Sequence, residues 1–121
     1  MDTMKLQIET VESMGDYLDK VIEGLDDIMN KFAQGENESA RQNCRFLFEG
    51  LEWLIDAAEL TQEFQGSRGV RINGTTAKDL LQDLVKAETE NNSNKIVEII
   101  DLRLKNEIQL WKSKTCELLA V

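Results

Sequence analysis

The sequence predicts an all-α protein that folds as a four-helix, uneven up-down bundle. Its 121 residues contain no Pro, although Pro makes up about 5% of average proteins and interrupts helices. Along most of the chain, apolar residues recur at alternating spacings of three and four, the period of an amphipathic helix. A chain of this length forms one domain, which we expect to span residues 1–121. The helices are expected near residues 10–34, 39–65, 77–90 and 95–119.

The first expected helix, residues 10–34, has one continuous apolar face. Thr10 is its expected N-cap, and Gly35 its expected left-handed C-cap. We expect residues 1–9 to form an extended N-terminal arm on the bundle, with a small strand pair as the alternative because apolar residues alternate both there and near Val70. The apolar face of the helix consists of Val11, Met14, Leu18, Val21, Leu25, Ile28 and Phe32.

The second expected helix, residues 39–65, carries two apolar seams. At 100° per residue they lie roughly 140° apart, so this helix has to be covered on two sides. The first seam consists of Ala40, Cys44, Leu47, Leu51, Leu54 and Ala58. The second seam consists of Phe46, Gly50, Trp53, Ala57, Leu60 and Phe64.

The second seam has the greatest consequence for function, and two interpretations of it stay open. In the first, the helix is central and both seams are internal. In the second, the seam is an interface for a second copy of the chain or for a helix of another protein. Aromatic residues are enriched at such interfaces, and Gly50 between Phe46 and Trp53 allows a close backbone approach.

A glycine-rich connector at residues 66–75 precedes the last two helices. The segment from Gly69 to Thr76 matches the pattern of a phosphate-binding loop except at one position, where the Lys that contacts the phosphates is missing. The segment before it is also expected to be a helix and not a strand. We therefore expect a plain connector. After an Asn-rich turn that supplies N-caps, the last helix is expected to bury Val97, Ile100, Leu104, Ile108, Trp111, Thr115 and Leu118.

Several classes of active site are excluded by the residue types that the chain lacks. It contains no His, which removes His-containing zinc sites, Ser-His and Cys-His pairs, and the Glu-x-x-His metal sites of helical bundles. Cys44 is expected to be buried, and Cys116 to be an exposed thiol with no activating group. We expect no metal, no cofactor and no catalysis. The remaining enzyme alternative would use carboxylates that border the apolar seams, namely Glu49, Asp101 and Glu107.

The charge distribution bears on the partners of the protein. The 14 basic and 23 acidic residues give a formal net charge of −9, which disfavours binding to nucleic acid and to anionic membranes. Residues 1–65 carry 15 acidic and 5 basic residues, whereas residues 66–121 carry 8 acidic and 9 basic residues. This asymmetry favours a protein partner or an oriented dimer. Because we find no secretory signal and no run of 18 apolar residues, we expect a cytoplasmic location.

Residues 40–115 resemble the flagellar secretion chaperone family, whose members are small cytoplasmic helical bundles that hold flagellin subunits unpolymerised before export. The matching features are the Gly-rich loop at residues 66–74, the Asn-rich turn at residues 91–94 and the apolar seam that ends at Trp111. The chain departs from that family in having no Pro before its first helix. The segment from Glu49 to Leu54 also resembles small, uncharacterised bacterial helical bundles.

The sequence therefore predicts a non-enzymatic, protein-binding adaptor or regulator that acts through an apolar helix surface. The resemblance implies an export chaperone as the alternative, and an enzyme that uses border carboxylates is the third possibility. The expected partner is another protein or a second copy of the chain. The candidate interface is Phe46, Gly50, Trp53, Ala57, Leu60 and Phe64.

Overall fold

The computed structural model describes residues 3–120, and every regular element in this range is a helix. The all-α prediction is therefore confirmed. Helices α5 and α6 join through the π-helical turn η1 into one continuous rod, so the described chain has five helices where the sequence predicts four. The elements are α1 (Thr3–Ala33), α2 (Asn37–Leu60), α3 (Gln62–Arg68), α4 (Thr75–Thr89), α5 (Ser93–Ile99), η1 (Ile100–Leu104) and α6 (Lys105–Leu119).

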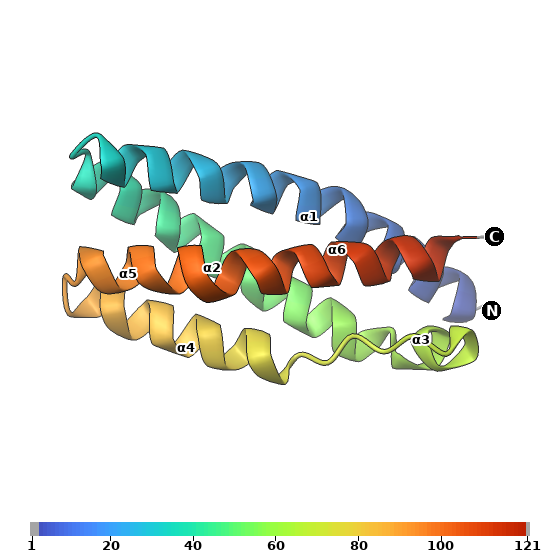
Figure 1. Cartoon of the computed structure of the whole chain (residues 1–121). Coiled ribbons are helices and arrows are strands. Elements are labelled where there is room, and N and C mark those ends of the chain that lie inside the picture. The colour runs from blue at the N-terminus through green and yellow to red at the C-terminus, as the bar shows by residue number, and fades with distance from the viewer. Residues whose placement is uncertain (1–2, 121) are drawn as a thin grey trace.

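The long helices lie side by side as two antiparallel hairpins (Figure 1). One hairpin is formed by α1 and α2, and the other by α4 and the rod of α5, η1 and α6. The short helix α3 lies at the end of the molecule where α1 begins and α6 ends. Helix α1 packs against both α2 and α6, and α2 packs also against α4. This arrangement leaves an outer edge of the α1–α2 hairpin that neither α4 nor α6 covers.

The N-terminal arm predicted for residues 1–9 is wrong for residues 3–9, which form the first turns of α1. Residues 1–2 lie outside the described range. Met4 and Ile8 are half-buried and continue the spacing of four and three that leads to Val11, so their alternation with Leu6 belongs to a helix and not to a strand. Thr10 is inside α1, where its hydroxyl donates a hydrogen bond to the Leu6 carbonyl at 2.8 Å instead of capping the helix.

The helix predicted for residues 39–65 is broken at Thr61. Helix α2 ends at Leu60, and the Thr61 hydroxyl donates to the Ala57 carbonyl at 2.8 Å. Gln65 on α3 is fully buried: its side-chain amide donates to the Ala58 carbonyl, and its side-chain oxygen accepts the Ile72 N–H, each at 2.8 Å. Both polar atoms of this buried amide are therefore hydrogen-bonded. Together the two bonds hold the connector, at Ile72, close to the end of α2, at Ala58.

The rod of α5, η1 and α6 contains a wide turn that the sequence interpretation missed. Ile100, Leu104 and Ile108 are all buried although they are spaced by four residues twice in succession. In a regular α-helix each step of four rotates the apolar face by about 40°. The π-helical turn at residues 100–104 absorbs this rotation, because it holds more residues per turn.

The core predictions are largely confirmed. Trp111 and every predicted face residue of the first helix except Phe32 are buried, and Gly35 ends that helix with a left-handed φ of 80°. Val97 is half-buried, and its neighbours Ile96 and Ile99 take the core positions.

Candidate functional site: the groove between α1 and α2

A groove runs along the uncovered edge of the α1–α2 hairpin. It consists of two adjoining hollows, of about 660 Å³ and about 210 Å³, that share Tyr17, Lys20 and Phe46. Both hollows are open to solvent, a shape that suits a protein surface better than an enclosed small molecule. The larger hollow is lined by Ser13, Asp16, Tyr17, Lys20, Phe46, Glu49, Gly50 and Trp53.

Two aromatic rings and a glycine form the floor of this groove. Gly50 on α2 has no side chain, and the ring of Tyr17 from α1 fills the space that a Cβ atom would need. Tyr17 also contacts Trp53 edge to face, with ring centroids 5.7 Å apart and planes at 79°. Such a pair contributes about 0.5–1.5 kcal/mol beyond the area that it buries. The two rings therefore form an ordered apolar platform at the surface.

Half of the predicted interface is exposed beside this platform. Phe46, Trp53 and Leu60 have exposed fractions of 66%, 42% and 74%. They follow one another at intervals of seven residues on α2, so they lie in one stripe along the helix.

The other three predicted interface residues are buried. Gly50 lies beneath Tyr17, and Ala57 and Phe64 are only 3% and 2% exposed. Phe64 belongs to α3, because the break at Thr61 changes the helix direction and turns this ring into the core. The seam is thus divided: Phe46, Trp53 and Leu60 are accessible to a partner, and Ala57 and Phe64 are not.

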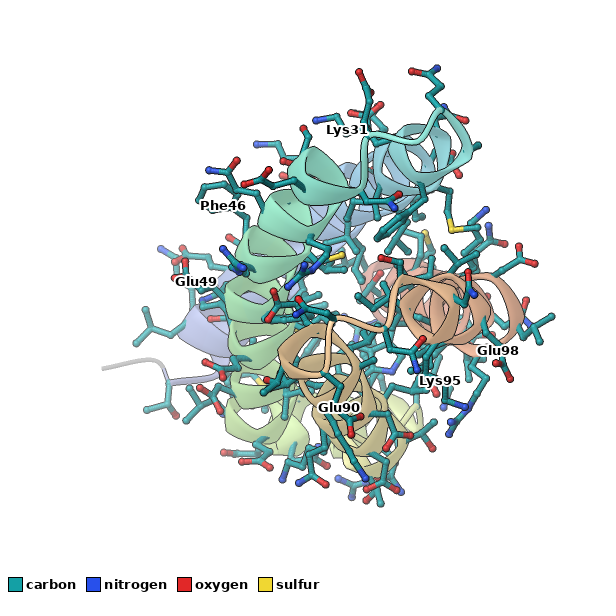
Figure 2. All side chains as sticks on the ribbon, turned by 90° about the vertical axis from the view of Figure 1, so that its left-hand side faces the viewer. Lys31, Phe46, Glu49, Glu90, Lys95 and Glu98 are labelled. Atoms are coloured by element: carbon teal, nitrogen blue, oxygen red, sulfur yellow. The ribbon has the colours of Figure 1, made fainter. Side chains whose placement is uncertain are left out.

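Charged side chains flank the apolar stripe on both walls of the groove. Asp16, Lys20 and Asp27 line it on α1, and Glu49 lines it on α2. In Figure 2, Phe46 and Glu49 project from α2 to the same side, away from α4 and α5. Among residues 3–120, Asp16, Asp27 and Glu49 form no ion pair.

Two acidic residues on the other side of α1 are paired with lysines of α6. Asp19 contacts Lys112 at 3.1 Å, and Asp26 contacts Lys105 at 3.4 Å. The Lys112 ammonium also donates to the Gly15 carbonyl at 3.1 Å. On the groove side of α1, by contrast, Asp16 and Asp27 form no ion pair within residues 3–120, and Lys20 is the one basic side chain that lines the hollows.

A second charged cluster joins α2 to α4. Arg45 and Arg41 both donate to the Glu88 carboxylate, at 2.8 Å and 3.1 Å. Hydrogen bonding to Arg45, followed by that to Arg41, holds the pKa of Glu88 below its usual value despite partial burial. Burial, and then the neighbouring Glu88 charge, raises the pKa of the Cys44 thiol to about 11. Cys44 is buried as predicted, and its raised pKa makes it a weak nucleophile.

The groups considered for catalysis do not converge on one site. Asp101 is exposed on η1, Glu107 is half-buried on α6, and Glu49 lies on the groove wall of α2. Across residues 3–120, no three His, Cys, Asp or Glu side chains come together as a metal-binding group. Cys116 is exposed on α6, as predicted.

The connector forms a shallow hollow of about 410 Å³ between α2 and the start of α4. Its two basic residues already have partners: Arg71 donates to the Gln62 carbonyl and side-chain oxygen, and Lys78 contacts Glu59. The Asn73 side chain accepts the Thr75 N–H at 2.9 Å where α4 begins. This segment is built as a connector with a helix start.

Sequence reasoning missed the α1 wall of the groove. Asp16, Tyr17 and Lys20 all lie outside the apolar face that the sequence predicts for this helix. The available signal was the placement of Ser13, Tyr17, Lys20 and Gly24 at alternating spacings of four and three, which makes a second, weaker stripe on that helix.

These features define an acidic, all-helical protein with an aromatic groove on its surface. The chain belongs to the family described as a domain of unknown function (DUF8042), whose match covers residues 9–114. No curated protein and no solved structure matches the chain. The match is not to the flagellar secretion chaperones, so that resemblance stays a prediction. No helix within residues 3–120 has the length and apolarity that crossing a bilayer requires.

Proposed function

We propose that this protein is a non-enzymatic adaptor or regulator that binds another protein in the groove between α1 and α2. The observation that carries the proposal is the exposed stripe of Phe46, Trp53 and Leu60, of which Phe46 and Trp53 line an open hollow. Successive members are about 10.5 Å apart along the helix axis, which is the spacing of anchor residues in helix–helix recognition. Aromatic residues contribute most of the binding free energy in many interfaces.

The fixed positions of the side chains in the groove support the same function. The Tyr17 ring is held between Gly50 and Trp53, so a partner would meet side chains that are already in place. A surface that needs little ordering on association loses less conformational entropy, and more of its contact energy contributes to affinity.

Two other large exposed apolar side chains supply a contrast to Phe46 and Trp53. Leu102 on η1 and Leu110 on α6 are 63% and 49% exposed, and neither lines a hollow of the described structure. Single exposed leucines of this kind are common on monomeric proteins. Leu110, with an exposure close to that of Trp53, is therefore a matched control position.

The test places a photo-crosslinking amino acid at Phe46 or, as the control, at Leu110, in cells that produce the protein. We expect a discrete adduct from position 46 only. The adduct partner is then identified and purified, and its binding to the intact chain is measured by calorimetry. Trp53→Glu should abolish binding and Leu110→Glu should not, with helicity retained in both.

Three results would contradict the proposal. The first is that position 46 gives no adduct. The second is that positions 46 and 110 give the same adducts. The third is that the partner still binds the Trp53→Glu variant. Light scattering of the purified chain distinguishes one further outcome: an adduct and a mass that correspond to two copies would identify the surface as a homodimer interface.

A further inference from the structure

We infer that the groove takes a basic amphipathic helix, whose apolar seam lies on the Tyr17–Trp53 platform and whose Lys or Arg residues lie along the groove walls. This inference rests on the proposed function and adds the chemical class of the partner. Two independent features of the groove carry it, the period of its apolar residues and the placement of its charges.

The period indicates that the partner segment is helical. The exposed apolar residues of α2 repeat every seven residues from Phe46 to Leu60. On α1, Ser13, Lys20 and Asp27 line the two hollows and also repeat every seven residues. A third helix laid between two antiparallel helices meets both repeats with its own seam, whereas an extended strand, which repeats every two residues, does not.

The charges indicate that the partner is basic. Asp16 and Asp27 on one wall and Glu49 on the other carry no ion pair among residues 3–120, and Lys20 is the single basic side chain that lines either hollow. At 100° per residue, Glu49 lies about 40° from Trp53, on the side of the stripe away from α1. Acids thus border the apolar stripe on both sides. Lys or Arg residues that flank the seam of a partner helix would meet them.

The same charges argue against a second copy of this chain as the occupant. A two-fold contact places the same surface on both copies, so Asp16 and Glu49 of one chain would approach those of the other. The segment that forms both walls, residues 1–65, carries 15 acidic and 5 basic residues, which makes the two faces repel. A basic helix has no such penalty.

The test uses the intact chain and three fluorescently labelled peptides of about three heptads each. The first has a Leu seam flanked by Lys, the second has the same seam flanked by Glu, and the third has the Lys peptide's composition with the seam scrambled. Binding is measured by fluorescence anisotropy. We expect only the first peptide to bind, and its affinity should fall when the salt concentration is raised to about 0.5 M, which shortens the Debye length.

Matched variants locate the charges. Replacing Asp16 and Glu49 by Lys together should weaken binding of the Lys peptide roughly tenfold, because two groove-edge charge pairs are reversed. Replacing Asp101 and Glu117 by Lys, which changes the net charge equally at exposed sites outside the groove, should change the affinity by less than about twofold. Trp53→Glu should abolish binding.

Each other outcome overturns the inference in a distinct way. Equal binding of the Glu-flanked peptide, dependent on Trp53, would show that the groove takes helices without selecting basic ones, so the proposed function would stand. If both double variants lost the same amount of affinity, binding would depend on the net charge of the protein and not on the acids of the groove. Binding of none of the peptides would overturn the basic-helix assignment, and the crosslinking experiment would then decide on the proposed function independently.

Discussion

The two sides of α1 use the same types of residue and reach opposite results. Toward α6, Asp19 and Asp26 pair with lysines, and the buried Trp111 belongs to the core. Toward the outer edge of α2, Asp16 has no ion pair among residues 3–120, and Trp53 is 42% exposed. One side is a closed contact in which charges and rings are satisfied within the chain. The other leaves the same types of group exposed at the surface.

The largest expected effect comes from exchanging the two tryptophans in turn for Ala. Trp111→Ala should lower the free energy of unfolding by about 3–5 kcal/mol, since it leaves a cavity in the core. Trp53→Ala should cost less: about 0.5–1.5 kcal/mol for its contact with Tyr17, plus the burial lost by a ring that is 42% exposed. Urea unfolding followed by circular dichroism measures both, with Trp111→Phe as the milder variant if Trp111→Ala does not fold. Equal costs would place Trp53 in the core and remove the distinction between the two sides.

An intermediate effect is expected at Gly50, where the groove is tightest. Gly50→Ala should destabilise the protein by about 1–2 kcal/mol even though Ala favours helices, because the new Cβ atom would overlap the Tyr17 ring. In a Tyr17→Ala background the same substitution should stabilise the protein by up to about 1 kcal/mol. A double-mutant cycle from unfolding curves measures this coupling. If Gly50→Ala has the same effect in both backgrounds, Tyr17 does not occupy the glycine position in solution.

The smallest effect separates the paired from the unpaired acids of α1. Asp19→Asn and Asp26→Asn should each lower the free energy of unfolding by about 0.2–1 kcal/mol at low salt, since each loses a lysine partner. Asp16→Asn and Asp27→Asn should be neutral or slightly stabilising, since they remove unpaired negative charge. The same substitution at four positions of one helix provides its own control. Destabilisation by the second pair equal to that by the first would mean that the groove acids have partners within the chain.

The fold class and most of the core follow from the sequence because burial repeats with the helical period. The spacing from Val11 to Ile28 identifies the buried face of α1, and every residue of that seam is buried. The apolar spacing did not predict the secondary structure correctly where contacts with another helix determine it. Met4, Leu6 and Ile8 alternate as a strand does, yet packing of Met4 and Ile8 on the core makes them helical.

The break at Thr61 shows the same limit at the candidate site. No Gly or Pro marks it, and the seam from Phe46 to Phe64 continues through it without interruption. The break is stabilised by Gln65, whose partners Ala58 and Ile72 lie seven residues away on either side, and by Gln7 of α1, which accepts the Phe64 N–H at 2.8 Å. Contacts of this kind are invisible to periodicity, so the spacing assigned Phe64 to the same seam as Phe46 although its ring is buried.

The sequence by itself determined that the protein is helical, that its first half is acidic and that α2 has more apolar surface than one neighbour can cover. These properties depend on residue type and on spacing within one element. Only the tertiary structure decided that α3 turns Phe64 inward, that Tyr17 covers Gly50, and that lysines of α6 neutralise one side of α1 and not the other. Such outcomes depend on which elements meet, because a side chain is covered or left exposed by its neighbours in space and not by its neighbours along the chain.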